Sequence, residues 1–335
     1  MTCDFLAFCS DTSAADLERL PWDQQLALMI ALASTHDQLT KQVRPGFVER
    51  VAVNNREHQT LTAAGLGQMQ RAGLAPATGS AEAMHDWPAG SARLRLRFRL
   101  LSPLLSIEQD TFGLFDNALR KDRLFLCPHL SAATIKGLAA DAYQRAFPPA
   151  TPWDQSGASD PERTRALRAA DPSAGRLFGL ANADDTDVAQ GPPGFVAGQG
   201  RLQFSPVWFE RVQFLVMNPQ DPRTASGTVP IQFEAVAPDQ EAQVDLIYFN
   251  PAGFDQSDEG TVRADLARLL WALAQWWPAL GLGAKRLAGY GAIAPLKARL
   301  EAVGWPSLGS ETVHDEQRQG PGSWAALAHW IDGDA

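Results

Sequence analysis

The segment Arg93–Leu100 constrains the fold strongly, because eight consecutive residues alternate strictly between arginine and an apolar side chain. A period of two is the pattern of a β-strand, in which successive side chains point to opposite faces of a sheet. One face of this strand therefore enters a hydrophobic core, and the other carries Arg93, Arg95, Arg97 and Arg99. Two interpretations of the arginine face stay open: an exposed surface kept soluble by charge, or a surface that meets phosphates or an acidic partner subunit.

Other patterns predict further elements along the chain. Ser131 is a plausible N-cap of a helix, residues 266–280 have the apolar spacing of a buried helix, and residues 324–331 are apolar enough to dock as a short helix. Helical patches precede a linker rich in Ala, Gly, Pro and Ser at residues 73–89. Additional strands are expected at residues 200–206, 209–218, 229–236 and 243–249. The expected organisation is a helical extension at 1–85, a main domain at 90–300 and an acidic tail with a short helix at 301–335.

Residues 281–291 form a stretch with four glycines, two adjacent cations and one aromatic. Glycines let a backbone approach a ligand closely and expose amide groups. Lys285 and Arg286 place positive charge beside those amides, and Tyr290 offers a flat face for stacking on a base. The simpler alternative is that Gly281 or Gly283 only ends the preceding helix as a C-cap. The stretch matches neither a Walker loop nor a dinucleotide fingerprint, because a helix precedes it.

The segment that follows Pro128 has the features of an anion site. A helix N-terminus offers free amide groups, and Ser131, Thr134 and Lys136 would lie in or just beyond its first turn. Gly137 costs about 1 kcal/mol relative to alanine inside a helix, which suggests that something packs very close to it. As a capping pattern alone the segment would be ordinary.

Composition describes an acidic folded protein with a local basic region. The chain has 335 residues, a net charge of −9 and 45% hydrophobic residues. Residues 91–150 nevertheless hold nine Lys or Arg against five Asp or Glu, which permits one basic face. No run of 18 apolar residues and no signal-peptide pattern is present, so we expect a cytoplasmic protein without membrane contact. The spacing of the three cysteines suits neither a zinc site nor a disulfide framework, and the six histidines form no obvious pair, so no metal or other cofactor is expected.

Four motifs in order resemble the RAMP superfamily, the RNA-binding subunits of CRISPR-Cas effector complexes. They are Pro128-His-Leu-Ser-Ala-Ala-Thr-Ile-Lys-Gly137, Leu177-Phe-Gly179, Gly200-Arg-Leu-Gln-Phe204 and the stretch 281–291. The stretch 281–291, the segment Met217-Asn-Pro219 and the segment Pro230–Phe233 make the chain most similar to the sixth subunit of the Cmr (type III-B) complex. The family usually carries an arginine soon after Lys-Gly. Here Ala139, Ala140 and Asp141 follow, and Arg145 comes later.

This resemblance implies a modified ferredoxin-like (RRM-like) α+β fold with insertions and an N-terminal helical extension. It implies a structural subunit of a type III effector complex that grips guide RNA (crRNA) by its backbone, with target RNA and other CRISPR effector subunits as partners in antiviral defence. Base pairing, not the protein, would read the target sequence. The expected RNA-binding residues are Ser131, Thr134, Lys136, Gly137, Arg223, Gly283, Lys285, Arg286, Gly289 and Tyr290.

Two alternatives are kept beside this hypothesis. Related backbone subunits cut target RNA with one aspartate that precedes the Ser-x-x-Lys-Gly segment, and Asp116 falls near that position, with Asp110 a weaker candidate. The chain would then be a metal-dependent endoribonuclease, and Mg²⁺ would be required only in that case. The second alternative, a stand-alone RRM-like RNA binder, is disfavoured by the acidic balance and by the missing aromatic pair on a central strand.

Overall fold

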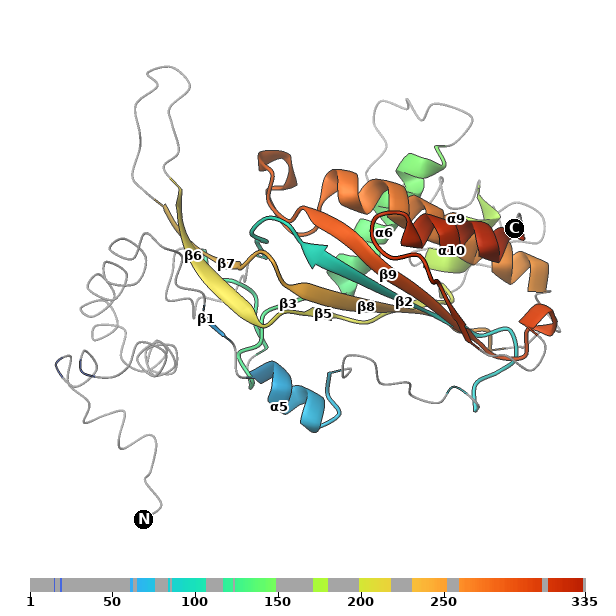
Figure 1. The fold of residues 1–335 in the computed structure, drawn as a ribbon, viewed down its shortest axis with the longest axis horizontal. Coiled ribbons are helices and arrows are strands. Elements are labelled where there is room, and N and C mark those ends of the chain that lie inside the picture. The colour runs from blue at the N-terminus through green and yellow to red at the C-terminus, as the bar shows by residue number, and fades with distance from the viewer. Residues whose placement is uncertain are drawn as a thin grey trace, which may run out of the picture. The chain divides into compact units, whose positions relative to one another are not determined.

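Strand β2 (Ala92–Leu100) is the central strand of a five-stranded antiparallel sheet in the computed structural model. It pairs on one side with β8 (Glu241–Tyr248) and on the other with β9 (Ile293–Ala302). The outer strands are β4 (Leu202–Phe204) beside β8 and β10 (Val313–Asp315) beside β9. The strand order is therefore β10-β9-β2-β8-β4 (Figure 1).

The structure describes only part of the chain, in two compact units. Unit 1 comprises residues 1–75, 103–129 and 209–240, and unit 2 comprises residues 76–102, 130–208 and 241–335. The predicted extension at 1–85 lies largely outside the described residues, and the predicted domain boundaries stay a prediction. The described residues are 15, 19, 61–62, 65–75, 84, 86–106, 117–122, 124–148, 171–179, 199–217, 231–251, 259–308 and 313–333.

The connections of unit 2 give a ferredoxin-like topology. Along the chain the elements run β2, α6 (Ala132–Ala146), β4, β8, α9 (Glu259–Leu280) and β9. This is the order β-α-β-β-α-β, and its four strands lie in the sheet as fourth, first, third and second. The predicted α+β class is thus confirmed, and β10 extends the sheet by one strand at the edge next to β9.

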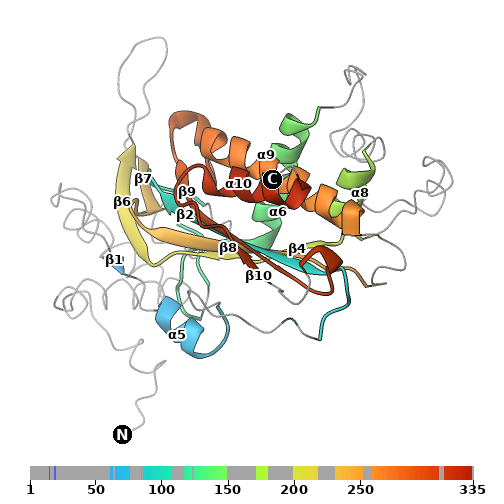
Figure 2. The same cartoon turned by 45° about the vertical axis from the view of Figure 1, so that its right-hand side comes forward.

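Helices cover one face of this sheet. In both ribbon views α6, α9 and α10 (Ser323–Asp332) lie together on the same side of the strands (Figures 1 and 2). Burial of large apolar side chains holds this layer together: Trp277 of α9 and Trp324 of α10 are fully buried and meet edge to face, with ring centroids 6.1 Å apart. The segment expected as an acidic tail therefore supplies a strand and a packed helix to unit 2.

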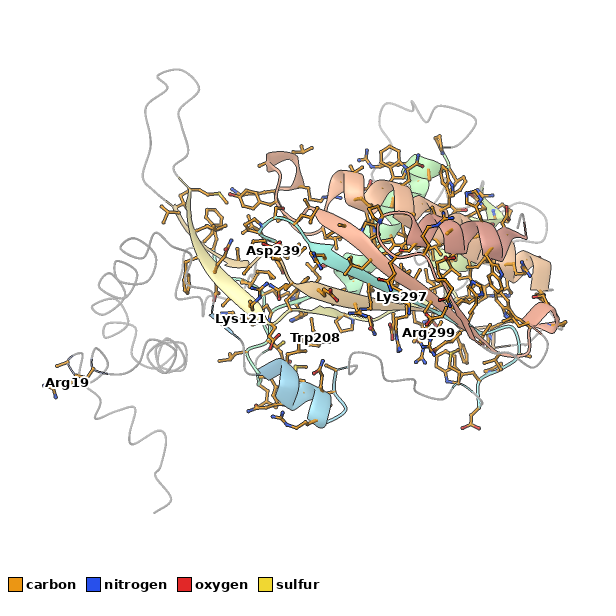
Figure 3. The ribbon with its side chains drawn as sticks, viewed as in Figure 1. Arg19, Lys121, Trp208, Asp239, Lys297 and Arg299 are labelled. Atoms are coloured by element: carbon orange, nitrogen blue, oxygen red, sulfur yellow. The ribbon has the colours of Figure 1, made fainter. Side chains whose placement is uncertain are left out.

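The strand predicted at residues 93–100 is confirmed, but its arginine face differs from both interpretations. Arg93 and Arg95 are buried, at 2% and 6% exposure, and pair with carboxylates of neighbouring strands, Glu301 and Asp245. Only Arg97 and Arg99 are partly exposed, and both lie within ion-pair distance of Glu241. Figure 3 shows Lys297 and Arg299 on β9, the strand that also carries Glu301. The arginine face is thus neutralised within the chain rather than offered to phosphates.

Two of the sequence motifs are accounted for by packing between their backbones. Helix α8 (Pro172–Phe178) ends at Gly179, and Gly200 follows a bridge between Gly179 and Gln199. A Cβ at Gly200 would lie 2.4 Å from the carbonyl carbon of Phe178, so only glycine fits. The ring of Phe178 stacks on that of Phe204, with 6.4 Å between centroids. The Leu-Phe-Gly and Gly-Arg-Leu-x-Phe motifs therefore join β4 to α8.

Unit 1 contains a three-stranded sheet of order β1-β6-β7. The strands are β1 (Leu61–Thr62), β6 (Arg211–Met217) and β7 (Ile231–Val236), and the helix α5 (Gly65–Arg71) follows β1. Lys121, marked in Figure 3, forms an ion pair with the buried Glu234 of β7.

Two short strands, β3 (His129–Leu130) and β5 (Val207–Trp208), form a separate ladder, and a 3-10 turn spans Pro306–Leu308.

Candidate nucleic-acid interface

The predicted helix start after Pro128 is confirmed in its capping geometry. Ser131 is the N-cap of α6, with φ −67° and ψ 154°. Its hydroxyl accepts a hydrogen bond from the Thr134 backbone amide at 3.2 Å and lies 2.9 Å from the Thr134 hydroxyl. Lys136 is half-buried and Gly137 is exposed. The first two turns of α6 therefore present capping hydroxyls, one lysine and one glycine at the protein surface.

No described segment of the chain supplies the close neighbour expected at Gly137, so a bound ligand in that place stays a prediction. A Cβ added at this position would meet no atom within 4 Å outside its own helix. No segment of the described chain packs against Gly137, although the residue costs helix stability. With respect to the part of the chain that the structure describes, the space in front of this turn is open, so an external ligand can approach the backbone there.

The glycine-rich loop that follows α9 is closed at its base by two glycines. Gly281 ends α9 with φ +75°, so the C-cap alternative is confirmed for this residue. The Leu282 amide donates to the Gly291 carbonyl at 2.8 Å. A Cβ at Gly291 would lie 1.8 Å from the Leu282 carbonyl oxygen, and one at Gly281 would lie 2.9 Å from the Gly291 oxygen. These two glycines let the ends of the loop cross in direct backbone contact.

The tip of the loop exposes Lys285 and Leu287, whereas Arg286 is half-buried. Lys285 adopts a left-handed conformation with φ +53°, and the 3-10 turn η4 (Arg286–Ala288) follows it. Gly289 is also left-handed, with φ +86°, and no atom lies within 4 Å of a Cβ built on it. Leu287 at the tip is fully exposed, and the sequence pattern did not predict this exposure. Gly283 and Tyr290 are half-buried on either side of the tip.

A contact between Arg286 and Asp141 joins the loop to α6. One Arg286 guanidinium nitrogen lies 3.5 Å from the Asp141 carboxylate. Asp141 follows Gly137 by four residues and therefore lies on the same face of the helix. Its other oxygen accepts from Arg145 Nε at 3.0 Å. The exposed face of α6 and the loop thus form one surface, here called the α6–loop surface.

The α6–loop surface brings together most of the expected RNA-binding residues and adds Asp141 and Arg145, which sequence reasoning did not assign. Their spacing of four and eight residues from Gly137, which places them on the same helix face, is a signal that the sequence does contain. The contact between Asp141 and Arg286 could not be read from the sequence, because 145 residues separate the two. The expected residues that belong to the loop, to α6 or to its N-cap are Ser131, Thr134, Lys136, Gly137, Gly283, Lys285, Arg286, Gly289 and Tyr290.

Three other predictions concern residues that the structure does not describe. Arg223, Asp110 and Asp116 all lie outside the described residues, so their predicted roles stay predictions. Within the described ranges, no group of three or more His, Cys, Asp or Glu side chains is arranged to hold a metal ion. The same ranges contain no helix with the length and apolarity needed to span a membrane.

A buried polar network behind α9 is structural. Asp265 is fully buried and accepts two hydrogen bonds from Arg176, at 2.8 and 2.7 Å, and one from the Tyr248 hydroxyl at 3.3 Å. The Asp265 carboxylate raises the pKa of the Arg176 guanidinium by accepting its hydrogen bonds. Burial, with the nearby Asp265 charge, raises the pKa of Tyr248 to about 12. These groups tie α8 and β8 to the buried Asp265 of α9 and are not part of the α6–loop surface.

Comparison with known proteins finds no matching family model and no matching curated protein. Among solved structures, the chain is similar to a chain from a cryo-EM structure of the type III-B Cmr-beta complex bound to cognate target RNA. The match has a TM-score of 0.47 and 10% identity, and covers 89% of this chain and 97% of that chain. It is also similar to a chain of a CRISPR RNA-guided surveillance complex in a pre-nicking state. This match has a TM-score of 0.39 and 12% identity, and it covers 63% of this chain and 75% of that chain. Because both TM-scores lie below 0.5, these similarities alone define neither fold nor function.

Proposed function

We propose that this protein is a structural, guide-RNA-binding subunit of a type III CRISPR RNA-guided effector complex. The observation that carries the proposal is the contact between Arg286 and Asp141, which joins the middle of α6, one turn beyond Gly137, to the glycine-rich loop in one surface. The helix that begins at the predicted anion site is thereby in contact with the glycine-rich loop. A cytoplasmic location and a role in antiviral defence follow from this proposal.

The chemistry of the α6–loop surface suits a phosphate backbone. The N-terminal end of a helix carries partial positive charge and attracts anions, and Lys136 follows the first turn of α6. Lys285 and Arg286 extend the positive charge along the loop. Glycines at positions 137 and 289 leave open space in which RNA can approach the protein backbone closely.

Contacts of this kind bind RNA without reading its sequence. Phosphates are the same at every nucleotide, so the amide groups and cations of the α6–loop surface give position and affinity but no base specificity. In the proposed complex, pairing between guide and target supplies the specificity. This role needs no bound cofactor.

The order of four motifs supports the choice of family over a general RNA binder. The ferredoxin-like order of strands provides the scaffold on which those motifs fall: the Ser131 segment begins the first crossover helix, and the glycine-rich loop joins the second crossover helix to the last strand of the β-α-β-β-α-β unit. Guide RNA, target RNA and other effector subunits are the proposed partners. Native co-purification tests this directly, because such a subunit should bring short RNAs of uniform length with a constant 5′ sequence.

A charge-reversal variant tests the surface itself. The double variant Lys285→Glu, Arg286→Glu should bind single-stranded RNA at least about tenfold more weakly at low salt, because two phosphate contacts are replaced by repulsion. The slope of log affinity against log salt should become shallower by about 1.4, the value expected when two single-strand phosphate contacts are lost. Both quantities are measured by fluorescence anisotropy over a salt series.

The matched control changes charge equally elsewhere. Arg71 on α5 and Arg318 after β10 are both exposed and lie outside the α6–loop surface. The double variant Arg71→Glu, Arg318→Glu alters net charge by the same amount and should keep the wild-type salt slope. Equal loss of affinity in the two double variants would show that RNA binding does not depend on the α6–loop surface.

A further inference from the structure

Asp141 is a carboxylate shared by two arginines in the middle of the α6–loop surface. Its Oδ2 lies 3.5 Å from Arg286 of the loop, and its Oδ1 lies 3.0 Å from Arg145 on the next turn of α6. All three side chains are accessible, with exposures of 33%, 31% and 48% for Asp141, Arg286 and Arg145. An acidic group therefore occupies the centre of a surface whose other charged members are cationic.

The arrangement resembles the way in which arginines hold a phosphate. A carboxylate and a phosphate both present oxygens that accept charge-assisted hydrogen bonds from guanidinium groups. Arg145 is also supported from a second direction, because its guanidinium lies 5.9 Å from the ring centroid of Trp276. It therefore stays close to the surface even without Asp141.

The contacts of Asp141 are weak enough to exchange. The distance to Arg286 is at the outer limit for a hydrogen bond, and ion pairs between partly exposed side chains contribute little to stability. Asp141 has a short side chain fixed to the helix, whereas arginine side chains are long and turn easily. Both arginines can leave the carboxylate without any change in the fold.

We propose that Asp141 holds the place of an RNA phosphate in the free protein. When RNA binds, Arg286 and Arg145 turn from Asp141 to one phosphate of the backbone, and the Asp141 carboxylate is left to water. Arg145 is thus a further RNA-binding residue, about two helical turns beyond those expected from the motifs. This inference rests on the proposed function, because its ligand is the same RNA.

The isosteric substitution Asp141→Asn removes the competing charge. It should tighten binding of single-stranded RNA by roughly three- to tenfold at low salt, because two exposed ion pairs no longer have to break. The gain should shrink as salt screens these charges. Arg145→Gln should weaken binding, and adding it to Asp141→Asn should remove much of the gain. Fluorescence anisotropy gives the affinities, and thermal unfolding verifies that each variant is folded.

Asp315→Asn is the matched control. Asp315 is a similarly exposed aspartate paired with Lys297 at 2.9 Å, outside the α6–loop surface. The inference is overturned if Asp141→Asn gains no more affinity than Asp315→Asn, or if it loses both affinity and thermal stability, as it would if Asp141 only braced the loop. Wild-type protein that binds no RNA at any salt concentration would overturn the proposed function and this inference with it.

Discussion

Arg95 is buried beside Asp245 on the neighbouring strand β8, and its guanidinium donates hydrogen bonds to both carboxylate oxygens at 3.1 and 3.0 Å. Two positions along β2, Arg97 forms a similar pair with Glu241, but these side chains are 36% and 43% exposed. Water solvates the charged groups of Arg97 and Glu241 whether or not they form the ion pair. The buried pair has no such alternative, since a charge left alone in the interior retains its full desolvation cost.

This difference predicts unequal costs for two equivalent substitutions. Arg95→Met should lower the free energy of unfolding by about 3–5 kcal/mol, because Asp245 loses its buried partner. Arg97→Met should cost less than about 1 kcal/mol. Urea unfolding followed by circular dichroism compares them. The double variant Arg95→Met, Asp245→Leu should recover much of the lost free energy of unfolding. Equal effects of Arg95→Met and Arg97→Met would contradict the difference in burial between the two ion pairs.

At the level of the element, the glycine-rich loop depends on glycines for two separate reasons. Gly289 and Gly291 both have positive φ, at 86° and 72°, which disfavours any other residue. At Gly289 this conformation is the obstacle, because no atom of the described residues lies within 4 Å of an added Cβ. At Gly291 a Cβ would also collide with the Leu282 carbonyl at the crossing of the loop ends.

The two glycines therefore form a matched pair for testing the loop. Gly289→Ala should cost about 1–2 kcal/mol of stability, the usual cost of a left-handed residue. Gly291→Ala should cost more than about 3 kcal/mol, because the loop base must open to relieve the collision. It should also weaken RNA binding, since opening moves Lys285 and Arg286. Thermal unfolding and RNA titration measure both effects, and identical melting temperatures would show that the base is not closed as described.

The sequence was informative where a pattern depends on local spacing. Strand β2 follows from strict alternation, and the cap at Ser131 and the end of α9 at Gly281 follow from capping chemistry. Contacts between distant residues were not predictable in this way. The partner of Arg95 is 150 residues away, so an alternating arginine pattern looked like an open charged face. For the same reason, Asp141 could not be assigned to the site before its contact with Arg286 was known.

On the scale of the whole molecule, two tyrosines of the network around α9 join separate elements: Tyr248 joins β8 to α9, and Tyr143 joins α6 to the start of α8. Tyr248 donates to Asp265, and Tyr143 donates to Asp171, which also caps α8. Burial and the Asp265 charge raise the pKa of Tyr248 to about 12, and burial with the Asp171 charge raises the pKa of Tyr143 as well. Both hydroxyls are held in the neutral form by the folded state.

The linkage predicts loss of stability in alkaline solution. A raised pKa means that the folded state holds the proton more tightly, so this stabilisation is complete below the unfolded tyrosine pKa of about 10. It is lost as pH rises through the folded pKa of about 12 for Tyr248. The melting temperature of the wild-type protein should fall across this window, and the melting temperature of the Tyr248→Phe variant should fall less steeply. Parallel curves for the two proteins would argue against a role of Tyr248 in the alkaline transition.

The five-stranded sheet ends on both sides in three-residue strands, β4 and β10, while its long strands are all interior. A long open edge is a template on which another chain can add a strand, and repeated addition leads to aggregation. Edges of three residues offer few backbone groups for such addition. This sheet should therefore not be a site of edge-to-edge polymerisation at high concentration, and assembly of unit 2 with other molecules should proceed through side-chain surfaces rather than through extension of this sheet.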